Sequence, residues 1–255
     1  MSVALPLPAR PDPVLWAGAL LFAAMTAPTL GAAMLDARLH LGAPIWIKPL
    51  KFQLSIAVYL GTLAWFAAMM PERVRAARWW RLYGLAVVGA FLGEIAWIGG
   101  AAALGTASHY NASTPLWSTL YTLAGVLAVF GTTAAGVVAW QIGGGSTWRR
   151  SVSLGLWATF ALTLVVAGIL SGLGGHEVGG DGLDTGGGPL GWSRDGGDPR
   201  AAHFLATHAM HAIPLLGLLG ASRRGVWMGA GLYAAATLAV LAEALAGRPF
   251  LSTLL

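Results

Sequence analysis

Three side chains that are able to bind a metal ion or transfer a proton occur within apolar stretches of this sequence: Glu94, His208 and His211. Ionisable groups in apolar spans are costly, so they usually face a helix bundle's interior and mark function. His208 and His211 are three residues apart and share one face of a helix. Two such imidazoles can bind one divalent metal ion, zinc or iron, and a carboxylate from another helix can complete the site. The spacing therefore predicts a metal site formed by Glu94, His208 and His211.

A three-ligand site of this kind leaves one position open for water, whose pKa the metal lowers towards neutrality. In an alternative interpretation, Glu94 is the general base instead of a ligand. His203 is a catalytic proton relay or an auxiliary ligand. A structural interpretation stands beside this one. A buried histidine often only hydrogen-bonds a carbonyl group, and a lone protonated glutamic acid can link two helices.

The only two lysines of the chain, Lys48 and Lys51, follow Trp46 at the start of an apolar stretch. Lysines in this position either extend towards lipid phosphate groups or form a cationic clamp for an anionic head group. We assign Lys48, Lys51, His109 and Arg200 to the binding of a lipid or other amphipathic substrate.

The composition indicates a membrane protein. Of the 255 residues, 56% are hydrophobic and 10% are charged, against about 25% charged residues in soluble domains. Glycine (36) and tryptophan (12) are abundant, as in spanning helices and at lipid–water interfaces. We expect an all-α bundle in a single domain over residues 1–255. A bilayer crossing needs about 20 apolar residues, and seven stretches qualify: 14–34, 52–70, 82–104, 116–140, 152–172, 202–220 and 226–246.

Depth along these spans places the three candidate ligands at a similar level. At 1.5 Å per residue, Glu94 lies about 18 Å from the start of the third span. From the opposite side, His208 and His211 lie about 12 and 16 Å into the sixth. The sequence therefore predicts that they meet near the membrane midplane.

Arginines predict the orientation. Clusters of arginine occur at positions 73–81, 149–150 and 223–224, and these clusters fall on one side of the membrane if there are seven spans. The positive-inside rule makes that side cytoplasmic, so the N-terminus is cytoplasmic and the C-terminus is outside. The high alanine, glycine and arginine content favours a bacterial inner membrane. The net charge of +5 reflects these topology signals and not nucleic-acid binding.

A glycine-rich outer loop of about 29 residues, 173–201, separates the fifth and sixth spans, and loops this long are usually functional or disordered. The stretch Gly179–Asp184 fits one copy of a calcium-binding GGxGxD repeat. The loop is otherwise a flexible linker or an ordered lid, with Trp192 anchored in the interface and Arg200 paired with Asp198.

Seven spans and a late HxxH motif, His208 and His211, resemble the adiponectin-receptor and ceramidase superfamily of intramembrane zinc hydrolases. The resemblance covers topology and this motif alone, so it implies a seven-helix bundle and assigns no residue roles. Retinal is excluded because residues 226–246 contain no lysine. Haem is less favoured because three of the six histidines lie on one span; it would need His109 or His40 as an axial ligand. Covalent c-type attachment is excluded because the chain has no cysteine.

These features predict a metal-dependent membrane hydrolase or oxidoreductase with an outward-opening site. One alternative is a proton-coupled or metal transporter that uses the same glutamate and histidines. Another is a non-enzymatic sensor or complex subunit that uses the long loop as its contact surface. The oligomeric state is left open.

Overall fold

The computed structural model describes residues 10–181 and 190–250 and consists almost entirely of helices. They are α1 (Pro13–Leu35), α2 (Ile47–Ala67), α3 (Glu72–Arg75), α4 (Arg78–Ala103), α5 (Pro115–Ile142), α6 (Thr147–Gly172), α7 (Pro199–Leu218) and α8 (Arg223–Leu245). Between α1 and α2, β1 (Leu39–His40) and β2 (Ala43–Pro44) pair antiparallel, with Leu39 opposite Pro44. The all-α architecture is confirmed, and seven of the eight helices in the described part of the chain are long.

Local sequence signals explain where several helices begin. Asp12, Thr114 and Asp198 each cap a helix through a side-chain oxygen, and each is followed by a proline at the first helical position. Such an oxygen accepts from otherwise unpaired first-turn N–H groups, and proline has no N–H to leave unpaired. Ser146 and Ser222 cap α6 and α8 in the same way.

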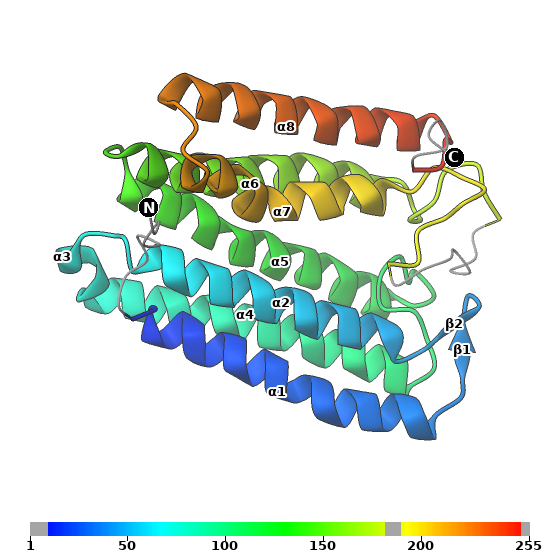
Figure 1. Ribbon diagram of the computed structural model, residues 1–255. Helices are drawn as coiled ribbons and strands as arrows, with labels where there is room; N and C mark the ends of the chain where they lie inside the picture. Colours follow the sequence, from blue (N-terminus) through cyan, green and yellow to red (C-terminus); the bar gives the residue numbers. More distant parts are fainter. Residues whose placement is uncertain (1–9, 182–189, 251–255) are drawn as a thin grey trace.

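The seven long helices lie side by side and alternate in direction (Figure 1). Helices α1, α2 and α4 pack together, α5 packs on α4 and α6, and α6, α7 and α8 form the other side of the bundle. The largest core cluster joins these two sides, because Leu60 and Leu63 of α2 share it with Val138 of α5, Leu156 of α6 and Met210 of α7.

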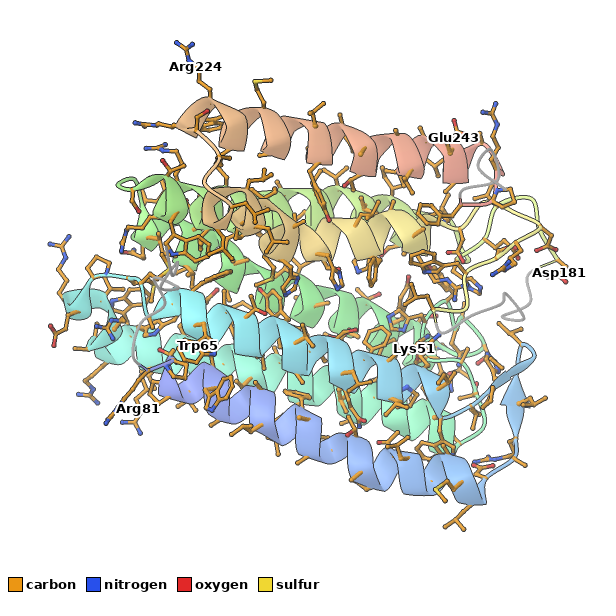
Figure 2. All side chains as sticks on the ribbon, viewed as in Figure 1. Lys51, Trp65, Arg81, Asp181, Arg224 and Glu243 are labelled. Carbon is orange, nitrogen blue, oxygen red and sulfur yellow. The ribbon has the colours of Figure 1, made fainter. Side chains whose placement is uncertain are left out.

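The alternation gives the bundle two chemically different ends. Figure 2 shows Arg81 and Arg224 at one end, and Lys51, Asp181 and Glu243 at the other. We call these the arginine end and the hairpin end, since β1 and β2 lie at the latter. The segments 73–81, 149–150 and 223–224 all fall at the arginine end, because each lies at or beside the N-terminus of α4, α6 or α8.

Six helices are long and apolar enough to cross a membrane: α1, α2, α4, α5, α6 and α8. The chain is therefore a multi-pass helical membrane protein. Helix α7 is 20 residues long but falls outside this group, since it carries three histidines and an arginine. It packs against α6 and α8. Because α7 is not among the six candidate spans, seven crossings remain a prediction.

The helices extend beyond the predicted apolar runs. Helix α2 begins at Ile47, not at residue 52, so Lys48 and Lys51 belong to its first two turns and not to an outer loop. Arg200 likewise belongs to the first turn of α7 and not to the loop 173–201. An apolar stretch marks only the part of a helix that lies in the hydrocarbon region. The backbone hydrogen bonds of the helix continue into the flanking polar turns, whose long side chains reach water.

Candidate functional site

Glu94 lies on α4, is only 5% exposed, and makes no hydrogen bond or ion pair with any residue that the structure describes. It stands about 14 Å from the hairpin end of its helix, at 1.5 Å per residue. A buried carboxyl group without a partner is costly unless it holds a proton or receives a ligand. Glu94 is therefore a site at which a bound molecule or a proton is expected.

Lys48, in the first turn of α2, supplies the nearest positive charge. Its ammonium group is close enough to act electrostatically on Glu94 of α4 and on His109 of the α4–α5 loop. The charge of Lys48 thus influences two of the predicted site residues, one carboxyl group and one imidazole.

His109 lies in an aromatic environment. Its ring centroid is 4.8 Å from that of Trp97, 5.5 Å from Phe52 and 5.6 Å from Tyr121, and Nδ1 is 3.1 Å from the Ser108 hydroxyl. Burial lowers the pKa of His109 well below its ordinary value, and the positive charge of Lys48 acts in the same direction. His109 is therefore a neutral imidazole near pH 7, able to donate one hydrogen bond and accept another.

The three histidines of α7 form a series along the helix. His203 has a buried Nδ1 without a partner among the described residues. The His208 ring stacks on Phe204 at 3.9 Å and its Nδ1 is 2.8 Å from the Phe204 carbonyl. The His211 Nε2 is 3.0 Å from the hydroxyl of Thr62 on α2.

Electrostatic influence and one ring contact relate the predicted residues to one another. Lys48 acts on Glu94 and His109, His203 acts on His109, and His208 acts on His203. The rings of His208 and His211 are 5.2 Å apart. We call this group the Lys–Glu–His cluster; it consists of Lys48, Glu94, His109, His203, His208 and His211.

The structure brings His208 and His211 together but does not add Glu94 to them as a third ligand. Helix α4 packs on α1, α2 and α5, whereas α7 packs on α6 and α8. Among the described residues, ligand atoms of three candidate side chains lie within 4.8 Å of one another only in Glu177, Asp181 and Asp195. The three-ligand site on Glu94, His208 and His211 stays a prediction.

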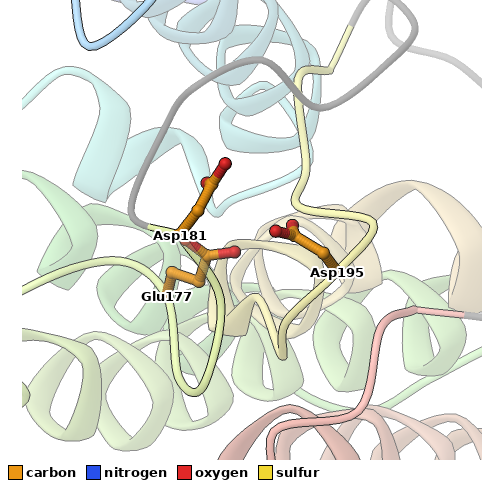
Figure 3. A group of neighbouring side chains, drawn as sticks. All are labelled: Glu177, Asp181 and Asp195. Atoms are coloured by element: carbon orange, nitrogen blue, oxygen red, sulfur yellow. The ribbon is translucent and has the colours of Figure 1, made fainter.

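The acidic group Glu177, Asp181 and Asp195 lies in the glycine-rich loop (Figure 3). The Ser193 hydroxyl hydrogen-bonds the carboxylates of Glu177 and Asp195, and this bond helps to hold the pKa of Asp195 below its ordinary value. Asp184, which ends the GGxGxD stretch, lies outside the described residues. The group therefore has an internal partner in Ser193, and the calcium alternative stays a prediction.

Two of the predicted substrate cations hold the glycine-rich loop. Lys51 donates from Nζ to the Leu190 carbonyl at 3.0 Å. Arg200 donates from Nη2 to the Gly191 carbonyl at 2.9 Å and pairs with Asp198 at 2.7 Å. Asp198 is only 1% exposed and caps α7.

Trp192 adds an apolar attachment of the loop to the bundle. Its ring packs edge-on against Phe204 and Phe250, with centroids 5.6 and 5.1 Å away. Together with the polar contacts of Lys51 and Arg200, this packing ties residues 190–198 to α2 and α7. The described part of the loop thus favours the lid interpretation over a linker.

Several site residues had no sequence signal of their own. Thr62 is an ordinary span residue by sequence, yet it bonds His211. Trp97 follows Glu94 by three residues, so helical spacing puts both on one face, but its stacking on His109 depends on the loop after α4. Arg149, interpreted as a topology signal, also donates to the carbonyls of Met69 and Ile142, at the ends of α2 and α5.

No protein-family model matches the chain, and no curated protein or solved structure is similar to it.

Proposed function

We propose that this protein is an intramembrane enzyme that binds an amphipathic substrate with an anionic head group and performs acid–base chemistry at Glu94. The observation behind the proposal is the buried carboxyl group of Glu94, which has no hydrogen bond among the described residues and on which the charge of Lys48 acts. A protonated lysine attracts a phosphate or carboxylate head group. A carboxyl group in a dry environment exchanges a proton more readily near neutral pH than one in water.

The proposal includes an orientation. Seven crossings with the arginine end in the cytoplasm put the Lys–Glu–His cluster in the outer half of the membrane, under the glycine-rich loop. This is the arrangement that the positive-inside rule favours for a bacterial inner membrane. The substrate then enters from the outer leaflet, with its chain among the helices and its head group near Lys48.

The binding step is tested with dodecyl phosphate, a single-chain anionic amphiphile, and purified full-length protein in a neutral detergent. We expect saturable binding by microscale thermophoresis, weakened about tenfold or more in Lys48→Gln, because a charge-assisted contact contributes about 1.5–3 kcal/mol. Lys51→Gln is the matched control, since Lys51 bonds the Leu190 carbonyl; it should bind nearly as wild type. Equal affinity in wild type and Lys48→Gln would contradict the proposed head-group contact.

The catalytic step is tested by incubating the protein with total bacterial lipid extract and comparing lipids by mass spectrometry. A species consumed by wild type and untouched by Glu94→Gln is expected, since the amide has nearly the same shape and cannot transfer the proton. If no lipid changes with wild type, or if Glu94→Gln turns over the same species equally fast, the enzyme assignment fails.

A proton-coupled transporter is the second candidate, and one observation favours it. The series of imidazoles continues from His203 through His208 to His211 and Thr62, further than a head-group site alone requires. Cargo-driven proton uptake into reconstituted vesicles, abolished in Glu94→Gln, would favour this candidate over the enzyme.

A further inference from the structure

Helix α7 carries two neighbouring imidazoles one turn apart, and one of them contacts α2. The ring centroids of His208 and His211 are 5.2 Å apart, with an angle of 46° between the ring planes. His211 contacts Thr62 of α2, so this face of α7 is turned into the bundle and not towards lipid. His211 is therefore turned towards α2, and both rings are partly buried.

One nitrogen of each ring is already held by the protein. His208 Nδ1 is 2.8 Å from the Phe204 carbonyl, and only an N–H can pair with a carbonyl oxygen. The proton of a neutral His208 is thereby on Nδ1, and its Nε2 has a lone pair. Metal-binding histidines commonly donate their other ring N–H to a carbonyl in this way, which orients the ring and raises its basicity.

The other ring supplies a second observation that points to a ligand. His211 Nε2 lies 3.0 Å from the Thr62 hydroxyl, while its Nδ1 is fully buried and has no partner among the described residues. In the tautomer that donates the Nε2 proton to Thr62, Nδ1 has an unused lone pair. A buried polar atom left in this state costs free energy that a bound cation would remove.

We propose that His208 Nε2 and His211 Nδ1 bind one divalent transition-metal ion, of which zinc or iron suits imidazole ligands. Water or the substrate head group occupies the remaining positions, since no third described His, Asp or Glu side chain joins the pair within 4.8 Å. This inference deepens the proposed function, because it puts a Lewis acid in the Lys–Glu–His cluster. It differs from the predicted three-ligand site in leaving Glu94 out of the coordination shell.

The test uses the full-length protein in neutral detergent, stripped with a chelator and titrated with Zn²⁺ by calorimetry. We expect one Zn²⁺ per chain and at least tenfold weaker binding in both His208→Gln and His211→Gln. His40→Gln is the control, because His40 lies in the β1 strand. Gel filtration and the helical circular dichroism signal are measured for each variant. A variant that matches wild type in both is folded, so its weaker Zn²⁺ binding is not due to unfolding.

Three outcomes would overturn the inference. In the first, the protein takes up no more Zn²⁺ than empty micelles do. In the second, the doubly substituted His208→Gln/His211→Gln takes up as much Zn²⁺ as wild type. In the third, Glu177→Gln loses Zn²⁺ binding instead, which would place the ion in the glycine-rich loop. Zn²⁺ binding is measured without turnover and without dodecyl phosphate. Its failure therefore leaves the Lys48 and Glu94 tests intact, and failure of those tests leaves the metal result intact.

Discussion

At the scale of single residues, the environment of a side chain decides its chemistry more than its type does. Lys48 and Lys51 are three residues apart on one helix, yet one acts on Glu94 and the other bonds a loop carbonyl. His109 is enclosed by aromatic rings, whereas His211 bonds a hydroxyl group. The same residue types thus meet different surroundings, and their proposed roles differ accordingly.

His109 makes the stability of the protein depend on pH in a predictable direction. Its folded-state pKa is lower than the ordinary value of 6.5 because of burial and the charge of Lys48. Below the ordinary pKa the unfolded chain takes up a proton that folded His109 does not, so stability is complete above that pH and falls as the pH decreases through it. The loss is up to about 1.4 kcal/mol per pH unit.

The measurement compares thermal midpoints of wild type and His109→Phe one pH unit above and below 6.5. The phenyl ring keeps the packing on Trp97 and cannot titrate. Wild type should lose more stability on acidification than the variant does. The other histidines are present in both proteins, so parallel losses would show that His109 is not protected from protonation.

At the scale of elements, close helix packing depends on glycines at the contacts. A Cβ atom on Gly155 of α6 would lie 2.9 Å from the Pro214 ring and 3.1 Å from the Ala209 carbonyl of α7. Small residues allow helix backbones in membranes to approach each other in this way. The position of α7, and with it the three histidines, therefore depends on this contact with α6.

Gly155→Ala is expected to destabilise the protein by about 1–3 kcal/mol, because the added methyl group forces α6 and α7 apart. Gly168→Ala is the matched control on the same helix, since a Cβ atom there meets nothing within 4 Å; it should be neutral or slightly stabilising. Thermal unfolding in detergent measures both. Equal midpoints for the two variants would contradict the close approach at Gly155.

At the scale of the whole molecule, the alternating helices separate the arginines from the Lys–Glu–His cluster. The eight arginines in segments 73–81, 149–150 and 223–224 lie at the arginine end, and Lys48, Lys51 and the glycine-rich loop lie at the other. With seven crossings these ends face opposite sides of the membrane. With six, α7 would not cross and α8 would be inverted.

The absence of cysteine makes this topology directly testable by single-cysteine labelling with an impermeant maleimide. Gly174→Cys and Ala246→Cys, both at exposed positions of the hairpin end, should be labelled in intact cells. Ala76→Cys, exposed at the arginine end, should be labelled only after permeabilisation. Labelling of Gly174→Cys without Ala246→Cys in intact cells would mean that α7 does not cross.

The sequence alone determined the class of the protein and the level of each polar group along its helix. Apolar runs are long because a bilayer requires it, and Asp12–Pro13, Thr114–Pro115 and Asp198–Pro199 mark helix starts through purely local hydrogen bonding. Rise per residue then gives depth without any knowledge of the fold. These properties follow from short-range chemistry, which a sequence displays directly.

The tertiary structure alone decided which groups at one level face each other. Glu94 and His208 have similar depth, but α4 packs with α1, α2 and α5 while α7 packs with α6 and α8, so the charge beside Glu94 is that of Lys48. The order of helices around a bundle and the rotation of each about its axis arise from many weak packing contacts. No residue spacing within a single helix encodes that order, which is why His211 meets Thr62 without any local sign of it.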